Sequence, residues 1–347
     1  MSRQPLAVLM NDLHISKDNI QEFNKNWNEA LGLCRKIKVK DLVIGGDVFT
    51  SRSSQSLSVL LAVQDAFVMA SDMGIHITVT NGNHDKVNPK DFRGYCNVFG
   101  TIKNVNVVDK YTALKWDGCD YVLIPVSYFP ETDGDLDWLL TSIKDDESLS
   151  GVPENKMILY LHEGIHGALG NFDIPGELPQ DAFKDYKSVL VGHYHNRVKI
   201  KGTNIEYIGA SRQHNFGEDE EKGYTILYSD GSTEFVKNEV NIRYKVINVD
   251  MDELGGIDRM LPDLASYKVN LRVNCKSEEA SGAWKQKFVE MGIKVDAVSE
   301  NIKISDIEHS GIEQRFDKEG IKREYVSFCE KRDVESDLGL KYLNKII

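Results

Sequence analysis

Cysteine is scarce in this sequence, and its spacing forms no recognisable pair. The five cysteines are scattered and odd in number, with no Cys-x-x-Cys: Cys34, Cys96, Cys119, Cys275 and Cys329. A disulfide framework is therefore not expected, and a reducing compartment fits this pattern best.

Long apolar runs are also absent. No run in the 347 residues reaches the length that spans a membrane. The first expected strand begins at residue 6, which leaves no room for a signal peptide before it. We therefore expect a cytoplasmic protein with no membrane partner.

Positive charge is in short supply. The chain has 42 lysines and arginines against 54 acidic residues, a net charge of −12, and a pI near 5.3. This balance argues against capture of a nucleic acid by a broad positive field, so any such binding must be local. The apolar content, 41%, is ample for a substantial core, and the length suits two domains.

Apolar runs short enough for buried strands alternate with helical stretches in the first part of the chain. The runs cover residues 6–10, 42–44, 76–80, 157–161 and 189–191. The helical stretches cover residues 20–37 and 57–73. This β-α-β-α-β beginning predicts a layered α/β domain. A more β-rich part follows, with expected strands at residues 105–108, 121–125, 197–200, 205–208, 224–228 and 234–236.

Each of the five early runs ends at residues of the kind that bind metals. Five of the nine histidines fall in these segments, which are Asp12-Leu13-His14, Gly46-Asp47, Gly82-Asn83-His84-Asp85, His162 and Gly192-His193-Tyr194-His195. Catalytic groups of open α/β sheets gather at the carboxyl ends of strands. We therefore expect these distant residues to share one cleft.

The chemistry of these residue types points to two metal ions. Imidazole and carboxylate together suit Mn²⁺, Fe²⁺ or Zn²⁺, and one carboxylate can bridge two ions. Asp47 is the natural bridge. Two ions roughly 3.5–4 Å apart can clamp a phosphate and acidify a water molecule. The pattern therefore predicts a two-metal phosphoesterase that needs no protein nucleophile.

Each motif alone has an ordinary structural interpretation. Gly46-Asp47 or Gly82-Asn83 would more often be a simple turn, and a lone His162 would more often be a core histidine. The pair His193 and His195 is less ordinary, because side chains two residues apart can point the same way. Recurrence at five strand ends favours the metal site.

In their order along the chain, the motifs D-x-H, G-D, G-N-H-D, H and G-H-x-H resemble those of the calcineurin-like metallophosphoesterase superfamily, over residues 8–195. The resemblance implies a two-sheet α/β/β/α sandwich. It implies that one ion is held by Asp12, His14, Asp47 and His195, and the other by Asp47, Asn83, His162 and His193. His84 would be a catalytic acid that is not a ligand, and Asp85 would orient it.

A second stretch is similar to SbcD-type DNA repair nucleases, which include phage-encoded subunits. It comprises residues 207–211, 215–218 and 221–224, with His162-Glu163-Gly164-Ile165-His166-Gly167 as a further likeness. The resemblance implies a DNA exonuclease and endonuclease of repair, recombination and replication. It also implies two Mn²⁺ ions, with Mg²⁺ as the alternative, a homodimer, and an SbcC-type coiled-coil ATPase as partner. A phage-encoded form would act in the host cytoplasm.

Four further residues are predicted to contact DNA near the rim of the cleft: Arg52, His166, Arg212 and His214. The arginines could each grip a phosphate with two hydrogen bonds. For either arginine taken singly, a solvated place on the surface is the simpler interpretation.

The pattern changes after residue 250. We expect a nuclease domain at residues 1–250 and a small α/β cap domain that binds DNA at residues 251–309, with strands at 271–274 and 293–298 and a helix at 278–291. Residues 310–347 have helical apolar spacing. This last segment either packs on its own domain or docks the ATPase.

Two rival functions remain at this stage. A small-molecule or cyclic-nucleotide phosphodiesterase would use the same site, but it would need neither a separate cap nor the segment after residue 207. A catalytically inactive scaffold that binds DNA or the ATPase would be expected to lack some of the metal ligands. Every expected ligand is present in this sequence.

Overall fold

The computed structural model describes residues 3–130, 134–170, 176–276, 282, 284–299 and the single positions 325, 326, 329, 336 and 340. Apart from those few positions, the predicted C-terminal segment 310–347 lies outside the described residues. The chain divides into two compact units. One comprises residues 1–245 and 262–268, and the other comprises residues 246–261 and 269–347.

The first sheet has six strands in the order β11-β10-β1-β2-β3-β4. Their bounds are β1 Pro5–Met10, β2 Asp41–Gly45, β3 His76–Thr80, β4 Val105–Val108, β10 Gly223–Tyr228 and β11 Thr233–Lys237. Strands β1 to β4 are parallel, while β10 runs antiparallel to β1. The carboxyl ends of β1, β2 and β3 therefore lie at one edge.

The second sheet has five strands in the order β5-β6-β7-β9-β8. Their bounds are β5 Val122–Pro125, β6 Met157–His162, β7 Ser188–Gly192, β8 Val198–Lys199 and β9 Ile205–Tyr207. Strands β5, β6, β7 and β9 are parallel, so β6 and β7 also end together.

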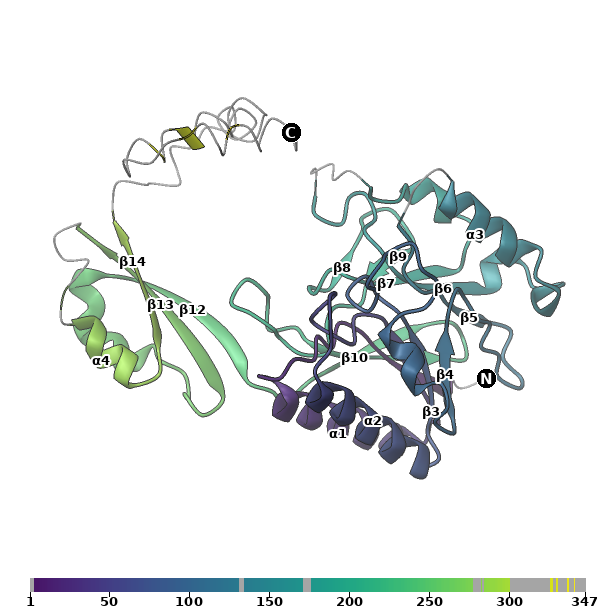
Figure 1. Ribbon diagram of the computed structural model, residues 1–347, viewed down its shortest axis with the longest axis horizontal. Coiled ribbons are helices and arrows are strands. Elements are labelled where there is room, and N and C mark those ends of the chain that lie inside the picture. Colours follow the sequence, from purple (N-terminus) through teal and green to yellow (C-terminus); the bar gives the residue numbers. More distant parts are fainter. Residues whose placement is uncertain are drawn as a thin grey trace. The chain divides into compact units, whose positions relative to one another are not determined.

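The two sheets pack face to face between two layers of helices. Alternating residues of β1 and β6, such as Leu9 and Ile158, meet in the core between the sheets. Helices α1 (Ile20–Ile37) and α2 (Leu57–Asp72) lie side by side on the outer face of the first sheet (Figure 1). Trp27 of α1 packs into the core beneath them. Helix α3 (Asp135–Lys144) covers the second sheet. The predicted α/β/β/α sandwich is confirmed.

A third sheet, in the order β12-β13-β14, follows the sandwich. Its elements are β12 Arg243–Asp250, β13 Tyr267–Cys275, α4 Trp284–Glu290 and β14 Lys294–Ser299. Strands β13 and β14 are parallel, as a β-α-β unit requires. Its role as a cap that binds DNA stays a prediction.

Helix α3 and strand β12 were not expected from the sequence. Strand β8 has only two residues, where four were expected. The 3₁₀ helices are Tyr95–Phe99, Glu147–Leu149, Glu154–Lys156, Gln180–Phe183 and Met251–Arg259. Among the described residues, no helix combines the length and apolar character needed to cross a lipid bilayer.

Candidate metal centre

The loops that follow β1 and β2 are joined by backbone hydrogen bonds. The amide of Asp12 donates to the carbonyl of Gly46 at 3.1 Å, and that of His14 donates to the carbonyl of Asp47 at 3.0 Å. The two loops therefore continue the pairing of their strands past the edge of the sheet. This pairing fixes where the three side chains of Asp12, His14 and Asp47 emerge.

Several of these residues have a left-handed backbone, which is rare for residues other than glycine. Six such non-glycine residues occur in the part of the chain that the structure describes, and four of them are predicted ligands. Their φ angles are 53° at Asp12, 41° at His14, 52° at Asp47 and 90° at His193. Strained backbone of this kind concentrates at functional sites, where the surrounding structure holds it in place.

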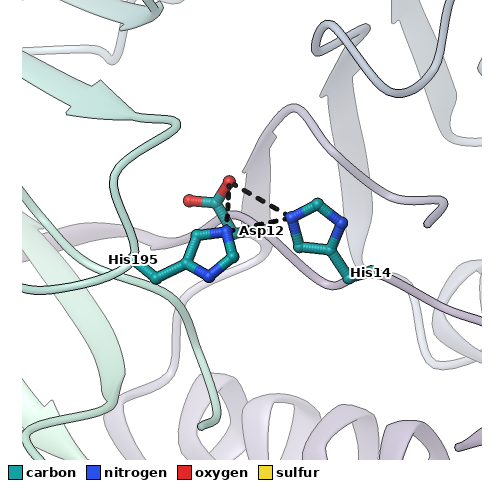
Figure 2. A group of neighbouring side chains, drawn as sticks. All are labelled: Asp12, His14 and His195. Carbon is teal, nitrogen blue, oxygen red and sulfur yellow. Dashed lines mark hydrogen bonds and ion pairs between the residues drawn. The ribbon is translucent and has the colours of Figure 1, made fainter. Parts of the chain in front are cut away.

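Asp12, His14 and His195 form one cluster of possible ligand atoms, although β1 and β7 belong to different sheets (Figure 2). The two Nε2 atoms of His14 and His195 lie 3.0 Å apart. Each is 3.9 Å from the same Oδ1 atom of Asp12. Three donor atoms thus converge on one point from two sheets.

Asp47 joins this cluster to a second one. Its Oδ2 atom lies 3.4 Å from Nε2 of His14 and 3.3 Å from Nε2 of His162. The side-chain oxygen of Asn83 is 3.3 Å from Nδ1 of His193. The position of Asp47 between the two groups is the one that a bridging carboxylate needs.

The donor set fits divalent cations. One end of the Asn83 side-chain amide lies 3.3 and 3.2 Å from the two carboxylate oxygens of Asp47 and 3.3 Å from ring nitrogens of His162 and His193. An amide oxygen at that end calls for a cation among these groups, whereas an amide nitrogen there would donate to them directly. Nitrogen and oxygen donors in this mixture suit Mn²⁺, Fe²⁺ or Zn²⁺.

The electrostatics of the centre also call for positive charge. Burial by itself raises the pKa of Asp47, but the charges of His162 and His14 lower it below its usual range. Burial likewise lowers the pKa of His162, yet the carboxylates of Asp47 and Asp12 outweigh burial and raise it to about 10. A proton on His162 or a divalent cation can supply the charge that the two buried carboxylates demand.

His84 lies beside this centre, held by the loop after β2. Its Nδ1 atom is 2.6 Å from the carbonyl of Thr50, and its backbone amide donates to Asp47 at 2.8 Å. The fully buried Asp85 acts on the backbone: it accepts from the amides of Gly82, Phe49 and Val48 at 2.8, 2.9 and 3.2 Å. The contact that orients the ring is therefore the one to Thr50, and Asp85 fixes the loops around it.

A pocket of about 420 Å³ opens over these residues, lined also by Arg52, Lys268 and Tyr244. Of the four predicted DNA contacts, Arg52, Arg212 and His214 line the pocket, whereas His166 is not among its lining residues. The exposed Arg52 lies against the amide of Asn83. Arg212 is only 3% exposed and donates to the carbonyls of Leu13 and His14 at 2.7 and 3.3 Å. It is thus not the solvated surface arginine of the simpler interpretation.

Several residues of the site were not predicted from sequence, among them Thr50, Lys268 and Glu218. Thr50 contributes a backbone carbonyl, which no residue type can signal. Lys268 is far along the chain from the motifs, and only folding brings it to the pocket. Glu218, 2.7 Å from Nδ1 of His195, lies inside a quoted motif but had no assigned role. The acidic residue within that motif was the sequence feature from which Glu218 could have been identified.

Comparison with known proteins agrees with this centre. The family described as calcineurin-like phosphoesterase matches residues 7–197, more than half of the chain. Exonuclease subunit 1 of Enterobacteria phage T4 is 26% identical over 220 residues, which are 60% of this chain and 59% of the phage protein. This chain therefore spans less than two thirds of the length of that curated relative.

Two solved structures share similarity at low identity. The nuclease MPE of Pseudomonas putida is 12% identical, with a TM-score of 0.27 over 64% of this chain and 84% of that one. A cold-active protein-tyrosine phosphatase of a psychrophilic Shewanella species is 15% identical, with a TM-score of 0.31 over 67% and 81%. At these TM-scores neither structure informs the function. The family match and the clustered ligand residues agree, and the chain belongs to the calcineurin-like phosphoesterase family, a family of metal-dependent phosphoester hydrolases.

Proposed function

We propose that this chain is the nuclease subunit of a DNA-processing complex and hydrolyses phosphodiester bonds of DNA. The observation that carries the proposal is that His84 and five predicted ligands from strand ends of both sheets line one pocket, with Asp12 and His162 clustered beside them. The similarity to a phage exonuclease subunit and the SbcD-type segment after residue 207 support DNA as the substrate.

The ligands would divide between two ions. Asp12, His14, Asp47 and His195 would hold one, and Asp47, Asn83, His162 and His193 the other, with Mn²⁺ proposed and Mg²⁺ as the alternative. Two such ions supply the positive charge that polarises a phosphodiester and a water molecule. The chain itself contributes the rigidity of the ligands, because the paired loops and left-handed turns fix them before substrate arrives.

His84 is the proposed general acid. Its Nδ1 faces the carbonyl of Thr50, which leaves Nε2 to donate a proton to the departing sugar oxygen or a hydrogen bond to the phosphate. Arg52, exposed at the pocket, can grip a neighbouring phosphate of the strand.

The net charge of −12 shapes the rest of the proposal. Arg52 and Lys268 supply local positive charge at the pocket, but a chain this acidic gains from a partner that provides further phosphate contacts. We propose an SbcC-type ATPase as that partner, with a homodimer of this chain as the assembly and the cytoplasm as its compartment. The contacts of His166 and His214 with DNA remain proposals of the same kind.

The test is incubation of the purified chain with end-labelled linear duplex and single-stranded circular DNA, with Mn²⁺ or Mg²⁺, and with or without the ATPase. We expect metal-dependent cleavage of both DNA species. The matched control is Asp12→Ala, which should remove cleavage without unfolding the chain, because Asp12 contributes little apolar burial.

Cyclic nucleotides and a small phosphodiester are run beside the DNA. Hydrolysis of these with no cleavage of DNA under any condition would establish the small-molecule phosphodiesterase instead. Binding of DNA by a chain that hydrolyses none of the substrates would establish the scaffold.

A further inference from the structure

The segment 213–222 after β9 contains residues 215–218, which resemble SbcD-type nucleases but have no role in the proposed function. In the structure this segment lies against His195. One carboxylate oxygen of Glu218 is 2.7 Å from Nδ1 of His195, and the side chain of Glu218 is 7% exposed. A buried carboxylate therefore touches the ring of a predicted ligand on the side away from the metal centre.

We propose that Glu218 is a positioning residue that fixes the tautomer and orientation of His195 and so sets the affinity of one of the two ion positions. The proposal rests on the two-metal function proposed above. It concerns the position that Asp12, His14 and His195 line.

The chemistry follows from the two nitrogens of imidazole. In the neutral ring one nitrogen carries the proton and the other has a free lone pair. Glu218 can only accept, so the proton of His195 lies on Nδ1 and the lone pair lies on Nε2. Nε2 is the atom that faces His14 at 3.0 Å and Asp12 at 3.9 Å (Figure 2). A carboxylate partner of this kind also makes the ring a stronger donor to a metal.

Glu218 is itself held on both oxygens. The side-chain amide of Asn215 donates to Oε1 at 2.8 Å, and the backbone amide of His214 donates to Oε2 at 3.0 Å. The backbone carbonyl of Glu218 accepts from Gln213 at 2.8 Å, and the same amide nitrogen donates to the carbonyl of Tyr244 at 2.9 Å. The carboxylate therefore cannot turn away from His195 without breaking several hydrogen bonds.

A fully buried lysine completes the arrangement. Lys222 has no exposed surface, and its Nζ atom donates to Asn196 at 2.7 Å and to Asp219 at 2.9 Å. Nζ is also 4.0 Å from Oε2 of Glu218. Buried lysines are rare without a partner, because removal of the charge from water is costly. Here the ammonium balances two carboxylates and ties the segment to the residue next to His195.

The other ion position is supported differently. His162 has its Nδ1 atom 2.7 Å from the carbonyl of Gly45, which is a neutral acceptor on the backbone. Removal of Glu218 should therefore affect one ion and leave the other. This asymmetry separates positioning of His195 from a general loosening of the site.

The experiment is a calorimetric titration of the full-length chain with Mn²⁺ in the absence of DNA. Wild type should bind two ions. Glu218→Ala should weaken one of them by about 10- to 100-fold, the usual effect of losing such a partner, and leave the other unchanged. Glu218→Gln, which keeps an acceptor but no charge, should fall between them. Cleavage by Glu218→Ala should recover at high Mn²⁺, with turnover near that of wild type.

Glu221→Ala is the matched control, since it removes the same charge from the same segment. Glu221 is exposed and pairs with Lys237, away from His195, so its variant should titrate as wild type does. Two ions bound by Glu218→Ala with wild-type affinity would overturn the inference. Equal weakening of both ions, together with a lower melting temperature in EDTA, would also overturn it and make Glu218 a structural residue. Binding of fewer than two Mn²⁺ ions by wild type would instead refute the two-metal function on which the inference rests.

Discussion

At the scale of single residues, His84 and the predicted ligand His195 differ in what holds their rings. The ring of His195 contacts the carboxylate of Glu218, whereas the ring of His84 contacts the carbonyl of Thr50 at 2.6 Å. A carbonyl accepts from Nδ1 whether the ring is neutral or protonated, so the ring can gain and lose a proton at Nε2 without turning. That property suits an acid in catalysis.

We predict that His84→Gln retains both ions but lowers turnover by roughly 10²–10⁴, the range typical of losing a positioned acid. Glutamine keeps a hydrogen-bond donor near the phosphate and cannot supply the proton. Metal content by elemental analysis and kcat on a short duplex are the measurements. A variant that has lost its ions would show that His84 is a ligand.

Gly82 shows how closely the backbone must approach the centre. A Cβ atom at this position would collide with the carboxylate and the backbone amide of Asp47. Gly82→Ala should therefore displace the bridging carboxylate, lower the free energy of unfolding by about 1–3 kcal/mol and weaken metal binding. Denaturant unfolding and a Mn²⁺ titration measure both effects.

The control for this variant is Gly32→Ala, in an exposed place on α1 with no atom within 4 Å of the new methyl group. Alanine in a helix interior should raise stability by about 0.5–1 kcal/mol and leave metal binding alone. Wild-type metal affinity in Gly82→Ala would mean that the Gly82 loop does not constrain Asp47.

At the scale of secondary structure, the sequence predicted the elements with the clearest periodicity. The strands that carry the ligands and helix α1 were placed within a residue or two, because their apolar spacing is regular and a ligand-type residue follows each strand. Helix α3 was not identified because it is only ten residues long, so its buried positions, Leu136, Leu139 and Ile143, make up a short stripe. Strand β12 was overlooked; it ends at Asp250, the last residue of the expected nuclease domain.

The residue types that make up the site could be predicted from the sequence, but the contacts between them could not. Asp12 and His195 are 183 positions apart, and only the packing of two sheets brings them together. The carbonyl of Thr50 and the reach of Lys268 depend on loop conformation, which side-chain chemistry does not encode. Sequence thus identified the chemistry, and the fold supplied the support around it.

The ends of α1 and α2 offer a test of helix termination. Helix α1 is capped at its C-terminus by Lys38, which has a left-handed φ of 60°, while α2 is followed by Gly74 with a φ of 74°. A left-handed residue with a side chain costs about 1–2 kcal/mol, partly offset by the extra entropy that glycine loses on folding. Lys38→Gly should therefore raise stability by about 0.5–1 kcal/mol, and Gly74→Ala should lower it.

Thermal melting of the two variants in the presence of EDTA checks this prediction, since metal binding then plays no part. Lys38 is exposed and is not among the residues that line the pocket, so activity should not change. A Lys38→Gly variant that melts below wild type would show that the lysine side chain contributes contacts that outweigh its backbone strain.

At the scale of the whole molecule, the metal centre connects the two sheets of the sandwich. Asp12, His14, Asp47 and Asn83 follow strands of the first sheet, and the three remaining predicted ligands, His162, His193 and His195, belong to the second. Ions bound between them would link both halves of the core at their carboxyl edge. Metal binding should therefore contribute to the stability of the fold as well as to catalysis.

Removal of metal is the corresponding prediction. An ion that binds only the folded chain stabilises it by about 2.7 kcal/mol when its free concentration is 100 times its dissociation constant. EDTA should thus lower the melting temperature by several degrees, and added Mn²⁺ should restore it. The near-isosteric Asp47→Asn keeps the size of the bridge but removes its charge, so its melting temperature should respond far less to Mn²⁺. A wild-type melting temperature that is the same in EDTA and in excess Mn²⁺ would show that the ions do not link the sheets, because a ligand specific for the folded state must stabilise it.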